Sequence, residues 1–186
     1  MLVKEIELNN GNKLEIFQND TPESPREYFS NATKMIFFHK RLNVGDKHNI
    51  NPDNYTSYGA IAQECFGEND IVMPVFAYSK RAFELSLTPF SCPWDSGQVG
   101  FIVVDEITIK VEFGGDKIKA LNNLKVELET YNDYLNGRTY GYRLEDSEGH
   151  EIDTCWGFYG TNFEENGIYD NAGINRMDVV EELEVR

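Results

Sequence analysis

Basic residues are scarce in this sequence of 186 residues: 17 Lys and Arg stand against 32 Asp and Glu, so the formal net charge at pH 7 is −15. A protein that binds DNA or RNA regardless of sequence needs a basic surface that displaces counterions, and this composition excludes that class. Long apolar runs are also missing, since none approaches the ~20 residues of a membrane-spanning helix. Residues 1–8 carry alternating charges and no apolar signal-peptide core. We therefore expect a cytoplasmic protein without a membrane partner.

Cysteine is equally scarce, and Cys65, Cys92 and Cys155 lie far apart in the chain. An odd number of cysteines without CxxC spacing favours a reducing compartment and argues against a disulfide scaffold or a zinc ribbon. HxH and HExxH patterns are missing as well, so neither a metal nor a cofactor is expected. The absence of repeats, low-complexity tracts and linkers predicts a single domain over residues 1–186, with an acidic C-terminal region at 145–186.

Apolar and polar residues alternate in several short segments, as they do in strands with one buried face. Residues 2–8 and 13–18 flank Asn9-Asn10-Gly11-Asn12, and this Asn-Gly turn predicts a hairpin. Residues 139–144 and 152–159 predict a second hairpin across a turn that contains glycine.

Three further segments are predicted from their composition. Residues 71–78 form a strand that Pro74 places at a sheet edge or beside a bulge. Residues 153–160 are apolar on both alternating faces, with Trp156 and Phe158 on the same one, so we expect a central strand. Residues 175–183 are a candidate helix.

Residues 116–135 carry apolar side chains at spacings of three and four, which predicts one long helix ended by Gly137. Its apolar positions are Ile118, Leu121, Leu124, Leu128, Tyr131 and Leu135. Several hairpins, shorter helices and few βαβ units complete the pattern. The predicted fold class is therefore α+β with a mostly antiparallel sheet.

Acidic residues concentrate towards the C-terminal end. Residues 145–186 contain 12 acids and two bases and sum to −10, whereas residues 26–48 contain five bases and two acids and sum to +3. Two interpretations compete: the acids maintain solubility, or they imitate nucleic acid and occupy the basic groove of a nucleic-acid enzyme. The candidate binding residues of such a surface are Glu145, Asp146, Glu148, Glu151, Asp153, Glu164, Glu165, Glu181, Glu182 and Glu184.

The most unusual segment is residues 89–101, Pro-Phe-Ser-Cys-Pro-Trp-Asp-Ser-Gly-Gln-Val-Gly-Phe. A loop held by a rigid scaffold often carries function. Cys92 could be a nucleophile with a histidine base, Gln98 could orient water, and Asp95-Ser96-Gly97 matches the short signature of aspartic proteases, which need two such carboxylates. The structural alternative is that Trp94 plugs the core while the neighbouring Asp or Ser caps backbone N–H groups.

A second segment contains His39, Asp46 and His48, which could serve as acid–base groups or metal ligands. In the structural alternative, the first histidine ends a strand and the other two residues decorate a loop. The full set of candidate catalytic residues is His39, Asp46, His48, Cys92, Asp95, Ser96 and Gln98.

Several segments together resemble one protein family. They are Pro25-Arg26-Glu27, residues 35–39, Gly45-Asp46-Lys47-His48, residues 88–101, residues 129–137, Tyr140-Gly141 and Cys155-Trp156-Gly157-Phe158-Tyr159-Gly160. The family comprises small acidic proteins encoded by phages, prophages and conjugative elements of Firmicutes and related bacteria. The resemblance covers most of residues 24–160 and is most specific over residues 92–100. It supplies no catalytic residues, and the chain has Ser79-Lys80-Arg81 where an acidic-His-Ser/Gly stretch is expected.

This resemblance implies an accessory role in a mobile element, and some proteins of this size and charge are anti-CRISPR or antirestriction proteins. Together with the charge it predicts a counter-defence protein in the host bacterial cytosol. Such a protein would bind and inhibit a host defence nuclease, for example a type II CRISPR effector with its guide RNA, or a restriction enzyme.

Two other functions are compatible with the sequence. One is an enzyme, a nuclease or other hydrolase, that attacks a defence component such as the guide RNA. It would use residues 92–98 together with His39, Asp46 or His48. The other is a housekeeping phage protein unrelated to defence, because a fold-level resemblance does not fix function. Convergence of the polar candidates in one pocket would favour an enzyme, and their dispersal would favour a binding protein.

Overall fold

The computed structural model describes residues 1–39, 42–80 and 82–185. Lys40 and Arg41 of the basic segment, together with Arg81 and Arg186, lie outside the described residues. The chain divides into two compact units: unit 1 consists of Met1–Ser24 and Asp133–Arg186, and unit 2 of Pro25–Asn132. The expectation of a single domain stays a prediction.

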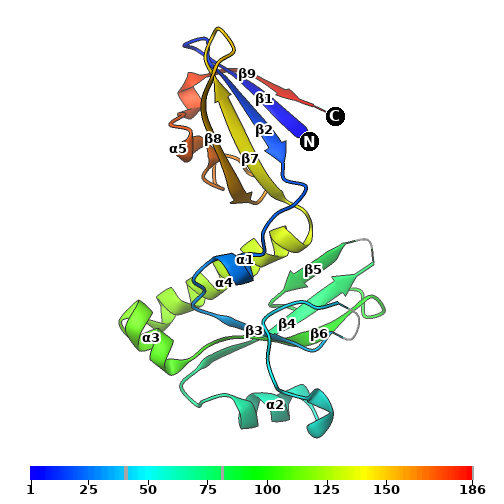
Figure 1. The fold of residues 1–186 in the computed structure, drawn as a ribbon. Coiled ribbons are helices and arrows are strands. Elements are labelled where there is room, and N and C mark those ends of the chain that lie inside the picture. Colours follow the sequence, from blue (N-terminus) through cyan, green and yellow to red (C-terminus); the bar gives the residue numbers. More distant parts are fainter. Residues whose placement is uncertain (40–41, 81, 186) are drawn as a thin grey trace. The chain divides into compact units, whose positions relative to one another are not determined.

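Unit 1 is built on a five-stranded sheet with the strand order β8-β7-β2-β1-β9, in which every neighbouring pair is antiparallel (Figure 1). Both predicted hairpins are present, as β1–β2 and β7–β8. The strands are β1 (Leu2–Leu8), β2 (Lys13–Gln18), β7 (Thr139–Glu145), β8 (Glu151–Tyr159) and β9 (Val179–Glu184).

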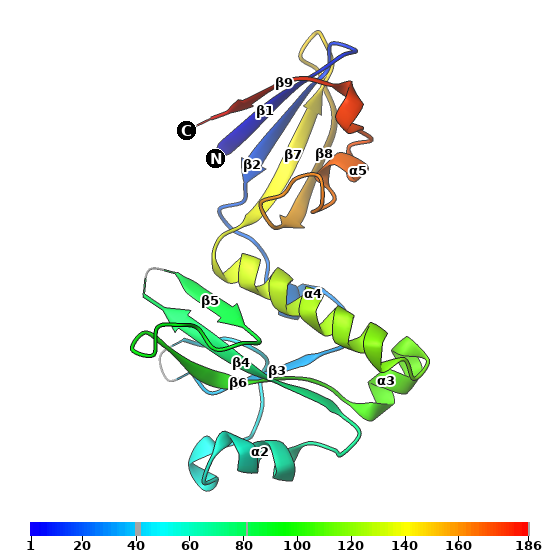
Figure 2. The same cartoon turned by 180° about the vertical axis from the view of Figure 1, so that it is seen from behind.

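The core of unit 1 lies on one face of this sheet. Alternation places Ile6, Leu14 and Tyr142 on that face, where they are fully buried. The segment between β8 and β9, with α5 (Ile168–Asn171) and the 3-10 turn η2 (Arg176–Asp178), packs against them through Ile168 and Tyr169 (Figure 2). The described elements of unit 1 therefore cover one face of the sheet and leave the other to solvent.

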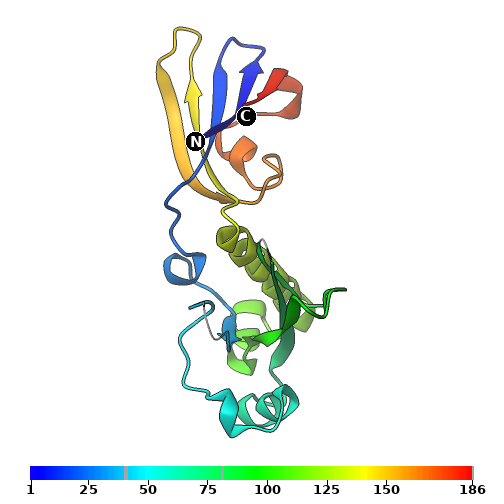
Figure 3. The same ribbon diagram turned by 90° about the vertical axis from the view of Figure 1, so that its right-hand side faces the viewer.

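Unit 2 contains a four-stranded antiparallel sheet of order β3-β6-β4-β5, with α2 and α4 on opposite sides of it (Figures 1 and 3). On the α2 side, Ile61 packs against Phe101 and Val103. The strands are β3 (Lys34–Phe37), β4 (Ile71–Ser79), β5 (Phe83–Ser86) and β6 (Ser96–Val104). The helices are α1 (Pro25–Tyr28), the 3-10 turn η1 (Pro52–Asn54), α2 (Tyr58–Cys65), α3 (Glu106–Phe113) and α4 (Lys117–Leu135).

The predicted α+β class, the antiparallel pairing and the long helix are confirmed. Ile118 is an exception within the predicted apolar face of α4, because its side chain is 74% exposed. None of the described helices is long and apolar enough to cross a membrane. Pro74 lies in β4 next to a register shift at Val75/Phe76, beyond the residues that β5 pairs with, so its missing N–H interrupts no ladder on that side.

Two predictions for unit 1 are wrong. Residues 175–183 form η2 and then β9, because the edge of β1 offers backbone partners to residues 179–184. The strand at 151–159 is an edge strand and largely exposed. Its aromatic residues do not share a face, since Gly157 has a φ of +97° at an irregularity in the β7–β8 register. Phe158 consequently packs into the core beside Tyr142, while Trp156 points to the uncovered face and contacts Phe17.

Replacement of Gly100 by Ala is expected to destabilise unit 2. A Cβ at Gly100 would lie 2.0 Å from the carbonyl oxygen of Ile36 in the neighbouring strand, so β3 and β6 would have to separate. We expect a loss of about 1–3 kcal/mol in the free energy of unfolding, typical of overpacking. Gly97→Ala on the same strand is the control, because its Cβ would meet nothing within 4 Å. Urea denaturation, monitored by circular dichroism, measures the free energy of unfolding of both variants. Equal stability of the two variants would contradict this account.

Candidate functional site

The two sets of candidate residues fall in different units. All seven candidate catalytic residues belong to unit 2, and all ten candidate binding acids belong to unit 1. The seven catalytic candidates divide further into four separate environments.

Cys92, Asp95 and Ser96 form a local hydrogen-bonded loop. The Ser96 hydroxyl donates to the carbonyl of Cys92 at 2.6 Å, and the Cys92 thiol lies 3.5 Å from Oδ2 of Asp95. The backbone of Asp95 accepts from the N–H of Ser79 at 2.9 Å, which fixes the loop to β4. Trp94 is 92% exposed, so the interpretation that it plugs the core is wrong. The loop presents this side chain to solvent instead.

His39 and Gln98 share a cavity of about 530 Å³. Its lining also includes Phe38, Tyr58 and Ser79. Burial raises the pKa of the Tyr58 hydroxyl above its usual value. The Nδ1 atom of His39 accepts from a backbone N–H at 2.9 Å, so the proton of a neutral ring is on Nε2. The cavity thus brings together two of the seven candidates.

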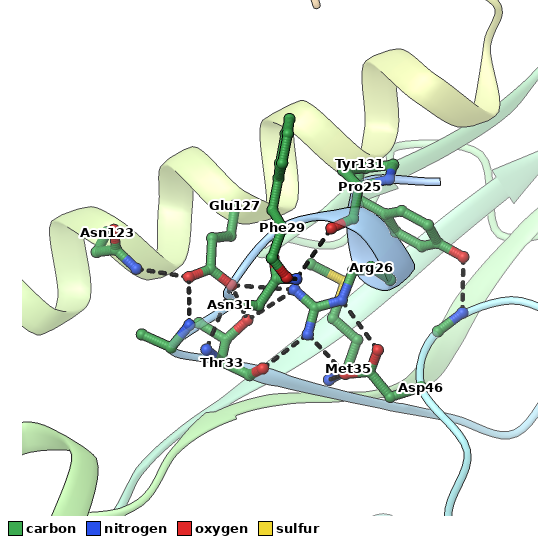
Figure 4. A network of polar contacts seen from close by, with 12 residues as sticks. Pro25, Arg26, Phe29, Asn31, Thr33, Met35, Asp46, Asn123, Glu127 and Tyr131 are labelled. Carbon is green, nitrogen blue, oxygen red and sulfur yellow. Dashed lines mark hydrogen bonds and ion pairs between the residues drawn. The ribbon is translucent and has the colours of Figure 1, made fainter. Parts of the chain in front are cut away.

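Asp46 is bound to a buried arginine (Figure 4). The guanidinium of Arg26 is 5% exposed and makes a two-pronged contact with Asp46 at 2.9 and 2.6 Å. Glu127 of α4 accepts from the same guanidinium at 3.0 Å and from the Thr33 hydroxyl at 2.5 Å. Asp46 also accepts from the N–H of Met35 at 2.8 Å, so its oxygens are occupied in holding the structure.

Arg26 stays charged in this setting. Burial by itself would lower the pKa of Arg26, but hydrogen bonds and charges of Asp46 and then Glu127 outweigh burial and raise it. A buried cation with two carboxylates is a structural ion cluster, and Asp46 is not available as a base.

His48 is held against β3. Its Nε2 lies 2.9 Å from the carbonyl of Phe37, and its ring meets the ring of Phe38 edge to face with centroids 5.2 Å apart. A carbonyl only accepts, so Nε2 carries the proton of the neutral ring and Nδ1 is an acceptor. That Nδ1 atom is buried and has no hydrogen-bond partner among the described residues.

The catalytic candidates therefore do not converge. Among the residues that the structure describes, no group of three or more His, Cys, Asp or Glu side chains is placed to hold a metal ion. A nucleophile needs a base within hydrogen-bond reach and a third group that orients the base. The described side-chain hydrogen bonds of Cys92 and Ser96 stay within residues 92–96.

Unit 1 carries most of the charge. It contains 18 acids and 6 bases, which gives −12, whereas unit 2 contains 14 acids and 11 bases, which gives −3. The two values add up to the −15 of the whole chain. Of the ten predicted binding acids, seven are exposed: Glu148, Glu151, Asp153, Glu164, Glu165, Glu181 and Glu184.

The other three acids are engaged within unit 1, and so are several of the exposed ones; Glu164, for example, pairs with Arg176 at 3.4 Å. Glu145 pairs with Lys13 at 3.4 Å and Glu182 with Lys4, while Asp146 accepts from backbone N–H groups of its own turn. Asp153 accepts from the hydroxyl of Tyr142 at 2.5 Å. Burial and then this carboxylate raise the pKa of Tyr142.

The uncovered face of the unit 1 sheet arranges further charges in rows across the strands. We call it the open face and define it by Glu5, Glu7, Lys13, Glu15, Phe17, Arg143, Glu145, Glu151, Trp156 and Glu181. In one row, direct cross-strand partners run Glu151–Glu145–Lys13–Glu7–Glu181 over all five strands. Glu7, Glu151 and Glu181 are exposed and make no ion pair with a described residue. Glu5, Glu7 and Glu15 were not among the predicted binding acids. Only the pairing of the strands places residues 5–15 beside the C-terminal acids.

The next part of the open face is an ion network. Glu15 is 5% exposed and pairs with Lys13 at 2.7 Å and with Arg143 at 2.5 Å. The guanidinium of Arg143 also lies over the ring of Phe17, 5.6 Å from its centroid. Beyond it, Trp156 is 52% exposed and lies 6.2 Å from Phe17, centroid to centroid.

Comparisons with protein-family models, with curated proteins and with solved structures found no match. The resemblance of residues 24–160 to proteins of mobile elements therefore stays a prediction.

Removal of Arg26 is expected to destabilise unit 2 strongly. Arg26→Ala leaves the carboxylates of Asp46 and Glu127 without their buried cation, which typically costs about 3–5 kcal/mol. Lys47→Ala is the control, because Lys47 is an exposed cation next to Asp46 and its loss should change stability by less than about 0.5 kcal/mol. The midpoint of urea unfolding reports both variants, and a stable Arg26→Ala protein would refute the structural role of the cluster.

Glu15 is expected to make unit 1 sensitive to acid. Burial raises the pKa of Glu15, but Lys13 and Arg143 lower it by more, so its folded pKa is below its unfolded value of about 4.3. A lowered folded pKa contributes stability above about pH 4.3, and this contribution is lost as pH falls through the folded value.

Glu15→Gln should therefore lower stability at pH 7 by about 1–2 kcal/mol and flatten the decline below pH 4.3. The exposed Glu165→Gln serves as the control. Thermal melts from pH 3 to 7 make the measurement, and parallel curves for wild type and Glu15→Gln would count against the lowered pKa.

Proposed function

We propose that this is a counter-defence protein of a mobile element, which inhibits a host CRISPR or restriction nuclease by binding through the acidic surface of unit 1. The observation that carries the proposal is the division of charge: −12 of the net −15 lies in unit 1. A basic nucleic-acid groove attracts such a surface at long range and holds it by the charges that otherwise contact phosphates.

The arrangement of carboxylates supports the same proposal. Cross-strand partners have Cβ atoms about 4.5–5.5 Å apart, so Glu7 and Glu181, which make no ion pair with a described residue, repel one another on the sheet. Cations of a partner would relieve this repulsion on binding. The mobile-element origin and the bacterial cytosol as the site of action rest on the sequence resemblance alone.

An enzyme is the second candidate function, and one observation favours it. His39, Gln98, Ser79 and Tyr58 line one cavity of about 530 Å³, a size that small-molecule and substrate sites have. The enzyme would attack a defence component such as the guide RNA. The dispersal of Asp46, His48 and the loop at 92–96 weighs against this candidate.

One gel separates these candidates. The pure protein is mixed with a guide-loaded type II CRISPR nuclease and target DNA, and both nucleic acids are run under denaturing conditions. We expect intact guide and uncut target, with inhibition that weakens as salt rises, because salt screens exposed charges. If the guide RNA is shortened by the wild-type protein and stays intact with His39→Ala, the protein is instead an enzyme. Normal cutting of target would contradict inhibition of this nuclease, and restriction enzymes are then assayed in the same way.

Charge reversal tests whether unit 1 is the binding surface. The variant Glu148→Lys, Glu151→Lys, Glu165→Lys, Glu181→Lys should lose inhibition. The matched control reverses four exposed acids of unit 2: Asp53→Lys, Glu64→Lys, Glu68→Lys and Glu112→Lys. Both variants change the net charge by +8, so inhibition that survives the first variant, or is lost equally in both, would contradict binding through unit 1.

A further inference from the structure

The open face of unit 1 presents one aromatic ring that its own fold leaves half uncovered. Trp156 is 52% exposed although it lies against the sheet. Its cross-strand partner is Gly141, where a Cβ would lie 2.3 Å from the indole, so only glycine leaves room for the ring. Contact with Phe17, whose ring centroid lies 6.2 Å from that of the indole, further fixes the position of the indole. The ring is therefore positioned before any partner arrives.

Arg143 shows which side chain this face accommodates. Its guanidinium lies 5.6 Å from the centroid of Phe17 and pairs with the carboxylate of Glu15 at 2.5 Å. An arginine thus contacts an aromatic ring and a carboxylate together on this face. Trp156 adjoins Phe17 and offers a second, larger ring, which is the best cation–π partner among the aromatic side chains.

Carboxylates lie within reach of the same ring. Glu145 is four residues from Gly141 along β7, about 13 Å at the rise of an extended strand. The row Glu151–Glu145–Lys13–Glu7–Glu181 crosses five strands, or about 19 Å at the usual spacing between strands. A partner with several cations spaced over such distances can contact the ring and the row at once.

We propose that the open face is a docking site for an arginine-rich protein surface, with Trp156 as the anchor on which one guanidinium stacks. This inference rests on the proposed function and specifies its contact: the basic groove of the nuclease would meet this face through arginines. Arginine is favoured over lysine because its planar guanidinium stacks on aromatic rings and pairs with carboxylates through two donors.

Charge argues against the other occupants of this face. A second copy in a two-fold dimer would bring the same patch against itself, and the row contains four carboxylates and one lysine. Nucleic acid would bring phosphates against the same row. Both meet like charge, whereas a basic protein meets opposite charge.

The first experiment measures the binding of two labelled peptides, one of ten arginine residues and one of ten lysine residues. Trp94→Phe leaves Trp156 as the single tryptophan of the chain, and the exposed Trp94 has no packing to lose. The arginine peptide should change the emission of Trp156 and, by fluorescence anisotropy, bind about 2–5-fold more tightly than the lysine peptide, as expected for an exposed cation–π contact. Trp156→Leu should abolish this preference and leave the affinity for the lysine peptide unchanged. Trp156→Ala, checked for folding by circular dichroism, should do the same.

The second experiment locates the charges. Glu7→Gln, Glu151→Gln, Glu181→Gln on the open face should weaken both peptides by about tenfold, the sum of three exposed ion pairs. Glu148→Gln, Glu164→Gln, Glu165→Gln is the control, since it removes three exposed carboxylates of unit 1 that are outside the row. Equal weakening by both triple variants would overturn the proposal.

Three other results would also overturn it. The preference for the arginine peptide could persist in Trp156→Leu, or it could be lost in Trp94→Phe. Sedimentation could also show that the wild-type protein is a dimer and that Trp156→Leu is a monomer. The nuclease assay is read separately. If the peptides behave as expected and the nuclease is not inhibited, the docking face is supported and the proposed target is wrong. If inhibition is found and survives Trp156→Leu and the open-face triple variant, the docking face is wrong and the proposed function stands.

Discussion

The guanidinium of Arg26 joins three segments of unit 2 that are distant in sequence. It contacts Asp46 in the loop after β3, Glu127 in α4 and the carbonyl of Thr33 at the start of β3. Because the side chain is 5% exposed, each of these polar groups loses its water and depends on the others. The cluster therefore fixes where α4 lies on the sheet and where the loop at 42–48 runs. The same cluster removes Asp46 from the set of groups that could do chemistry.

Sequence patterns predicted the elements whose order depends on near neighbours. The Asn-Gly turn, the alternation in residues 2–18 and the three-and-four spacing in residues 116–135 each specify local geometry, and the structure contains all three. The segment at 175–183 depended on a distant partner, since β9 forms on the edge of β1. The positive φ of Gly157 likewise places Trp156 and Phe158 on opposite faces of the sheet. The alternation of apolar and polar residues in the sequence does not reveal such a backbone irregularity.

Functional positions were harder to foresee for the same reason. Asp46 and Glu127 are 20 and 101 residues from Arg26, and neither spacing signals a pair. Cys92, Asp95 and Ser96 are neighbours in sequence, and their side-chain hydrogen bonds lie within the loop itself. The acidity of residues 145–186 was visible in the sequence, whereas its continuation into Glu5 and Glu7 needed the strand order. Total charge is a property of composition, and its distribution over a surface is a property of topology.

Helix α4 bears on where the chain can be divided. The boundary between the units lies between Asn132 and Asp133, inside this helix of 19 residues. A helical backbone bond joins each N–H to the carbonyl four residues earlier, so a fragment that stops at residue 132 would lose the bonds of the last turn of α4. A fragment made to study unit 2 should therefore extend to Leu135, where the helix ends.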